Sequence, residues 1–142
     1  MYDQARNVSL LLARVAIGVI FLVHGYQKFA TMGIAGTTKF FESIGIPLPG
    51  LAAPLVAVLE VAGGIALILG VALPIAGTLL ALDMVGAILF AHLPAGFSVA
   101  EGGYEFVLAL AAASLAIGFT GGGALALDAV FGRPRGAASM SA

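Results

Sequence analysis

Four long apolar stretches dominate the hydrophobic pattern of the chain. They cover residues 8–30, 51–71, 74–93 and about 104–119. Each approaches the ~20 apolar residues that a helix needs to cross the ~30 Å hydrocarbon core of a bilayer. None alternates with the period of two that a half-buried strand shows, and a helix satisfies its own backbone groups in lipid. The pattern therefore predicts an all-α integral membrane protein, with a bundle of four transmembrane helices in a single domain over residues 1–131.

Proline and glycine mark the breaks between these stretches. The run Ile-Pro-Leu-Pro-Gly at 46–50 interrupts the chain before the second helix, and Pro74 suits the first turn of the third. Because the connection before Pro74 is very short, we expect the second and third helices to form an antiparallel hairpin.

Two shorter segments are too brief to span a bilayer. Residues 38–44 place Phe40, Phe41 and Ile44 on one helical face, which predicts a short helix in the membrane interface that packs over the outer mouth of the bundle. An ordinary polar loop is the alternative. After the glycine run at 121–123, residues 124–131 predict a turn on the surface, and residues 132–142 a disordered tail.

Composition supports a membrane location. The chain of 142 residues is 61% hydrophobic and 9% charged, more apolar than a small soluble domain could bury. Its net charge of −1 offers no basic face for nucleic acid. The absence of cysteine excludes disulfides, zinc–thiolate sites, iron–sulfur clusters and thiol redox chemistry on this chain. Any electron chemistry must therefore reside on a bound cofactor or a partner.

The distribution of basic residues predicts the orientation. Four crossings place both termini on one side, where Arg6, Arg133 and Arg135 outnumber Lys28 and Lys39 of the first loop. The positive-inside rule then favours cytoplasmic termini in a bacterial inner membrane.

Several ionisable residues fall inside the predicted spans, where each costs about 2.5–3.5 kcal/mol on insertion scales. A rise of ~1.5 Å per residue places Lys28 roughly 3 Å, His24 roughly 9 Å, Glu60 roughly 13 Å and Asp83 roughly 15 Å below the outer surface. His92 and Glu105 fall at the outer rim, and Arg14 near the inner end. The expected intramembrane polar site comprises Arg14, His24, Lys28, Glu60 and Asp83, with His92 and Glu105 at its rim.

Glu60 needs a cation partner at this depth. Arg14, Gly18, Gly25 and Lys28 share one face of the first helix, which we expect to look inward because small residues allow close packing and charge avoids lipid. Lys28 is the predicted partner of Glu60, directly or through His24, and Arg14 is the alternative.

Structural explanations remain open for the same residues. Lys28 and Arg14 can extend toward the interface, Glu60 and Asp83 can form a purely structural pair, and His24 can be a packed neutral imidazole. No dense ligand spacing predicts a metal site. His24 and His92 are about 8 Å apart along the membrane normal, which argues against a bis-histidine haem.

Three motifs carry a resemblance to a known family. They are Arg14-x3-Gly18-x5-His24-Gly25-x2-Lys28, Glu60-x2-Gly63-Gly64 leading to Leu69-Gly70, and Gly121-Gly122-Gly123 followed by Leu127-Asp128. Together they resemble the DoxX family of small bacterial membrane proteins over essentially the whole chain. The sequence departs from the family where Ala124-Leu125-Ala126 replaces more polar residues, which puts any role of the C-terminal turn in doubt.

The resemblance implies a four-helix bundle linked to redox complexes. Relatives of this kind include a membrane subunit of thiosulfate:quinone oxidoreductase and proteins associated with superoxide dismutase and thiol-oxidation resistance in mycobacteria. We therefore expect a non-catalytic subunit of a membrane redox complex whose polar outer pocket holds a quinone-like lipid or contacts a redox partner, with no covalently bound cofactor. Homo-oligomers are compatible with this expectation. A small transporter or proton-conducting bundle, and a structural scaffold, are the alternatives.

Overall fold

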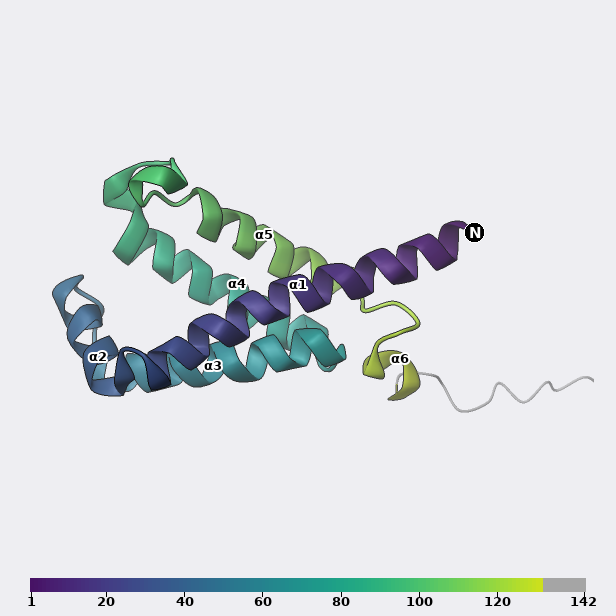
Figure 1. Cartoon of the computed structure of the whole chain (residues 1–142), viewed down its shortest axis with the longest axis horizontal. Coiled ribbons are helices and arrows are strands. Elements are labelled where there is room, and N and C mark those ends of the chain that lie inside the picture. The colour runs from purple at the N-terminus through teal and green to yellow at the C-terminus, as the bar shows by residue number, and fades with distance from the viewer. Residues whose placement is uncertain (132–142) are drawn as a thin grey trace, which may run out of the picture.

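The computed structural model describes residues 1–131, and every regular element in that range is helical (Figure 1). The long helices are α1 (Tyr2–Ala30), α3 (Pro49–Leu69), α4 (Leu73–Ala87) and α5 (Glu105–Thr120). The short ones are α2 (Gly33–Ser43), a π-helical turn η1 (Ile88–His92), the 3-10 turns η2 (Leu93–Ala95) and η3 (Val99–Glu101), and α6 (Leu127–Phe131). The predicted all-α fold is confirmed.

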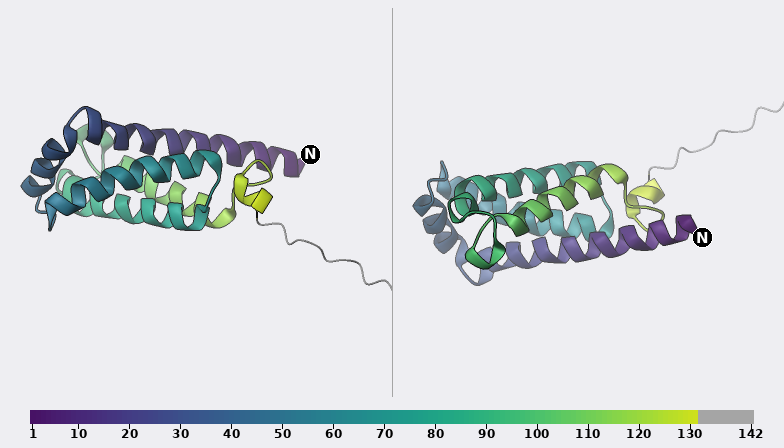
Figure 2. Two further views of the ribbon diagram at one scale, coloured as in Figure 1. Left: turned by 90° about the horizontal axis from the view of Figure 1, so that it is seen from below. Right: turned by 90° about the horizontal axis from the view of Figure 1, so that it is seen from above.

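Within residues 1–131, three helical segments are long and apolar enough to cross a membrane. They are α1 with 29 residues, α3 with 21, and the continuous run Leu73–Ala95 with 23. The fourth predicted span, α5, is apolar but has only 16 residues, which correspond to a rise of about 24 Å. It runs beside α4 along the bundle (Figure 2).

The long helices pack as two pairs. Helix α1 lies along α3, and α4 lies along α5, while the two pairs diverge toward the end that carries α2 (Figure 1). Glycines explain these close contacts, because a Cβ atom added to Gly64 would lie 2.6 Å from the carbonyl oxygen of Gly18, and one on Gly77 would lie 2.5 Å from that of Ser114. Helices α3 and α4 follow each other through a short turn, as predicted. However, α3 packs more extensively against α1, and α4 against α5, than the two pack against each other.

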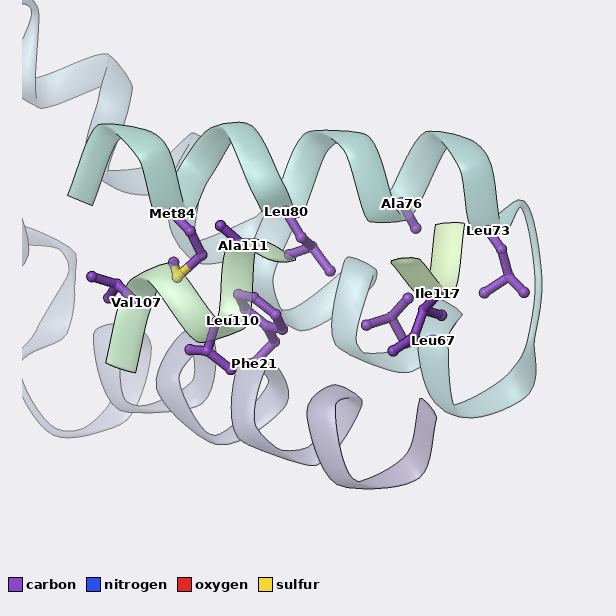
Figure 3. Packing of buried hydrophobic residues seen from close by; sticks show 10 residues of the cluster. All are labelled: Phe21, Leu67, Leu73, Ala76, Leu80, Met84, Val107, Leu110, Ala111 and Ile117. Atoms are coloured by element: carbon purple, nitrogen blue, oxygen red, sulfur yellow. The ribbon is translucent and has the colours of Figure 1, made fainter. Parts of the chain in front are cut away.

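A buried apolar cluster fills the bundle from its middle toward the end away from α2. Phe21, Leu67, Leu80 and Leu110 belong to it, and Figure 3 shows these side chains meeting between the helices. Toward α2, where the pairs have separated, side chains no longer fill the space completely.

The predicted interfacial helix is present but longer than expected, since α2 begins at Gly33. Phe41 is buried and Phe40 is 45% exposed. At the opposite end the N-terminus and α6 lie on the same side of the bundle (Figure 2). The predicted disordered tail, residues 132–142, lies outside the described residues.

Candidate functional site

A cavity of ≈ 590 Å³ lies between the two helix pairs at the α2 end. Its walls are mainly apolar and come from α1, α2, α3, α5 and the end of α4 with η1. Phenylalanines contribute much of this lining: Phe21, Phe40, Phe41, Phe90 and Phe106. Gly86 and Ala87, both small, also line it and leave room beside the polar groups described next.

An ion pair lines this cavity. Lys28 Nζ donates to Glu60 Oε2 at 2.7 Å, and the two side chains are 18% and 4% exposed. The predicted partner of Glu60 is thus confirmed, and the contact is direct rather than through His24. The close approach of α1 and α3 makes it possible, because a Cβ atom on Gly25 would lie only 3.0 Å from Glu60 Cβ. The long side chain of Lys28 therefore bridges the difference in membrane depth between Lys28 and Glu60 that the helical rise predicts.

Asp83 brings a second carboxyl to the same place from α4. It lines the cavity and is near enough to Glu60 and Lys28 for their charges to act on it. Its Oδ2 atom is buried and has no hydrogen-bond partner among the described residues. The cluster thus joins one ammonium to two carboxyls from three helices.

Both histidines line the cavity as well. His24 is on α1, one turn before Lys28. His92 ends the π-helical turn, and its Nδ1 lies 2.9 Å from the carbonyl oxygen of Gly102. Since a carbonyl can only accept, the neutral tautomer that makes this bond has its proton on Nδ1 and a lone pair on Nε2. π-helical turns in α-helices are frequent at functional sites.

Glu105 does not belong to the lining, contrary to its expected place at the rim of the site. Its Oε2 accepts a hydrogen bond from the backbone N–H of Val99 at 3.0 Å, and the side chain is exposed. It therefore fastens the loop between η3 and α5.

Arg14 is also separate from the cavity, so its inclusion in the polar site was wrong. The side chain is fully buried at the other end of the bundle, where Nη1 donates to the carbonyls of Leu67 and Ile68 at 3.1 Å and Nη2 to that of Leu125 at 3.3 Å. The last carbonyls of a helix lack partners within it. Arg14 supplies hydrogen-bond donors to the last carbonyls of α3, and its bond to the Leu125 carbonyl holds the C-terminal loop in place.

Asp128 completes this second polar cluster, and its role was not foreseen from the sequence. Its carboxylate accepts from the backbone N–H groups of Ala72 at 2.9 Å and Leu73 at 3.2 Å, and its own N–H donates to the carbonyl of Gly70. Gly70 has φ +74°, and a Cβ atom there would lie 2.5 Å from Arg14 Nη1. In the sequence, the Leu69-Gly70 and Leu127-Asp128 motifs are the signal that could have indicated this role. Both motifs contribute to the contact between the α3–α4 turn and the C-terminal segment.

Within residues 1–131, no three His, Asp or Glu side chains are grouped so that they could hold a metal ion. Lys28, Glu60, Asp83 and the two imidazoles supply the polar groups of the cavity, as hydrogen-bond donors and acceptors.

Comparison with known proteins decides the family. The DoxX family model matches residues 9–93. The chain belongs to the DoxX family. The matched span contains Lys28, Glu60, Asp83 and His92, so these polar groups of the cavity lie within the part of the chain that matches the family model.

Three relatives extend this result. The DoxX protein described here is 40% identical over 126 residues to "Putative oxidoreductase CatD" of Bacillus subtilis, with 89% of each chain covered. It is 34% identical over 132 residues to "Inner membrane protein YphA" of Escherichia coli, covering 89% of this chain and 93% of that one. It is 38% identical over 98 residues to "Uncharacterized membrane protein Rv3486" of Mycobacterium tuberculosis, covering 66% and 60%. No solved structure matches the chain.

Proposed function

We propose that this DoxX protein is a non-catalytic subunit of a membrane redox complex in the bacterial inner membrane, and that its cavity holds the head group of a quinone-like lipid. The cavity carries the proposal. An apolar chamber of ≈ 590 Å³ with a few converging polar groups has the size and lining typical of small-molecule sites.

The chemistry of the cavity matches a quinone in two respects. Phenylalanines on several walls offer faces and edges to a flat ring and to the first part of an apolar tail. Lys28 can donate to a ring carbonyl oxygen, while Asp83 and His92 Nε2 can accept from a ring hydroxyl. The same site can therefore hold the oxidised and the reduced ring.

Two further observations favour a role in redox chemistry. A relative that covers nearly the whole chain carries the name of an oxidoreductase. The absence of cysteine means that this chain contributes no thiol centre, so the electrons would reside on the ligand and on a partner subunit.

The apolar cluster weighs against a proton-conducting bundle. Phe21 and Leu110 line the cavity and continue into the buried layer with Leu67 and Leu80 (Figure 3). This layer separates the polar groups of the cavity from Arg14. The buried hydroxyl that α5 adds to it, Ser114, has no hydrogen-bond partner among the described residues, so it joins no hydrogen-bonded path across the layer.

The test is quinone binding by the purified protein in lipid nanodiscs. We expect native quinone in the solvent extract, and saturable binding of decyl-ubiquinone or menadione by calorimetry. Ala87→Phe should abolish binding because it fills the cavity, whereas the matched variant Ala62→Phe, on an exposed position of α3, should retain it. Binding that survives in Ala87→Phe, or no quinone in either experiment, would contradict the proposal and leave a scaffold as the better description.

A further inference from the structure

The polar groups of the cavity do not balance in charge. Lys28 is the cation of the cluster, and Glu60 and Asp83 are its two carboxyls. Glu60 is paired with Lys28, whereas one oxygen of Asp83 is buried without a hydrogen-bond partner in the described part of the chain. If both carboxyls were ionised, the cluster would carry one uncompensated negative charge in an apolar surrounding.

Both histidines face the same cavity as the cluster. Helix α1 contributes His24 beside Lys28, and η1 contributes His92, whose Nδ1 is engaged by Gly102. The lining residues from α2 and α5 include phenylalanines and aliphatic side chains but no titratable group. Arg14 is bound to carbonyls at the opposite end and contributes nothing to the balance.

We propose that Lys28, Glu60 and Asp83 form a one-proton site, in which the two carboxyls together bind one exchangeable proton and Asp83 presents it to the cavity. One proton makes the cluster neutral, with a Lys28–Glu60 ion pair and a carboxylic acid beside it. Neutrality is strongly favoured because a buried charge without a partner is costly in low dielectric.

The position of Asp83 gives this proton a route out of the cluster. Asp83 lines the cavity and its side chain is partly exposed although Oδ2 is buried, and its neighbours on α4, Gly86 and Ala87, are small. The proton would therefore leave the cluster at this wall of the cavity. A carboxylic acid donates to a carbonyl oxygen, and a carboxylate accepts from a hydroxyl, so a single proton serves either form of a ligand oxygen. This use of the proton rests on the proposed quinone site, but the existence of the proton does not.

The charge count predicts how many protons each variant holds. The wild-type cluster needs one proton. Asp83→Asn and Glu60→Gln each leave one ammonium and one carboxylate, so both variants need none. Lys28→Met leaves two carboxyls without a cation and needs two.

Infrared spectroscopy of the ligand-free protein in nanodiscs tests this count at neutral pH. We expect a carboxylic-acid C=O stretch that shifts on exchange into heavy water, that is absent in Asp83→Asn and in Glu60→Gln, and that has about twice the wild-type intensity in Lys28→Met, as the charge balance requires. Glu105→Gln removes an exposed carboxyl outside the cavity and should leave the band unchanged.

Two results would overturn the proposal. One is the absence of a protonated carboxyl band in the folded wild-type protein, which would place the balancing proton on His24 or leave the charge unbalanced. The other is a band that persists unchanged in both Asp83→Asn and Glu60→Gln. Since no quinone is present, loss of quinone binding would not affect this outcome, so the two proposals fail separately.

Discussion

The Lys28–Glu60 ion pair allows a quantitative prediction, because its two side chains are 18% and 4% exposed and only 2.7 Å apart. Lys28→Met leaves Glu60 and Asp83 without a cation and should reduce the free energy of unfolding by about 3–5 kcal/mol, the usual cost of breaking a buried pair. Glu60→Gln should cost less, about 1–3 kcal/mol, because Asp83 remains nearby as a partner for Lys28.

The double variant separates the interaction from the individual losses. Lys28→Met with Glu60→Gln removes both members of the pair, so its cost should fall short of the sum of the single variants by about 1–3 kcal/mol. As a control, Glu60→Gln combined with Lys39→Met, at an exposed position on α2, should be additive within about 0.5 kcal/mol.

Reversible unfolding in mixed detergent micelles, followed by circular dichroism, would give the free energies of unfolding of the wild type, the two single variants and the double variant. Additive losses for Lys28 and Glu60 would refute the reasoning, because they would mean that the two charges do not interact in the folded protein. Equal costs for the two single variants would show that Asp83 cannot replace Glu60.

Three other predictions concern packing, helix connection and orientation. Gly64→Ala should destabilise the protein by about 1–3 kcal/mol, since the new Cβ would lie 2.6 Å from the Gly18 carbonyl oxygen, whereas Gly86→Ala, which meets no atom within 4 Å, should be neutral or stabilising in the same unfolding assay. Asp128→Ala should lower the free energy of unfolding by about 0.5–2 kcal/mol, because two backbone N–H groups at the start of α4 lose their acceptor, and an unchanged unfolding midpoint would argue against this capping role. A reporter fused after Ala142 should be active only if it functions in the cytoplasm, and activity of a periplasmic reporter there would reverse the predicted orientation.

The two polar clusters at opposite ends of the bundle have different uses. The cluster at the α2 end borders a cavity and leaves a carboxyl oxygen without a partner, which is the arrangement expected where a ligand or a proton binds. In the Arg14 and Asp128 cluster, Arg14 Nε also has no partner among the described residues, but Nη1, Nη2 and the carboxylate of Asp128 bind backbone groups of the α3–α4 connection and the C-terminal loop, and neither side chain lines the cavity. Substitutions at Arg14 should therefore alter stability more than ligand binding.

Much of the fold was determined by local sequence. Apolar runs of 16 to 29 residues, broken by proline and glycine, form helices because each helix satisfies its own backbone hydrogen bonds in lipid. The inward face of α1 could be predicted as well, since the spacing of Gly18, Gly25 and Lys28 depends only on the helical repeat. The ends of the helices were less predictable. Helix α2 begins earlier than its aromatic pattern suggested, and α4 is followed by a π-helical turn that ends at His92.

Tertiary structure decided which charges meet. Depth along the membrane placed His24, Lys28, Glu60 and Asp83 in one half of the bundle, but whether Glu60 would pair with Lys28 or Arg14 depended on the approach of α1 to α3 at Gly25. The partners of Arg14 were out of reach of sequence reasoning, because they are backbone carbonyls exposed by the end of α3 and by a loop more than 100 residues away. The divergence of the helix pairs, which creates the cavity, likewise depends on packing between segments distant in the chain. Helical periodicity is a local property that a sequence carries in its spacing, whereas contacts between helices depend on the fit of many side chains at once.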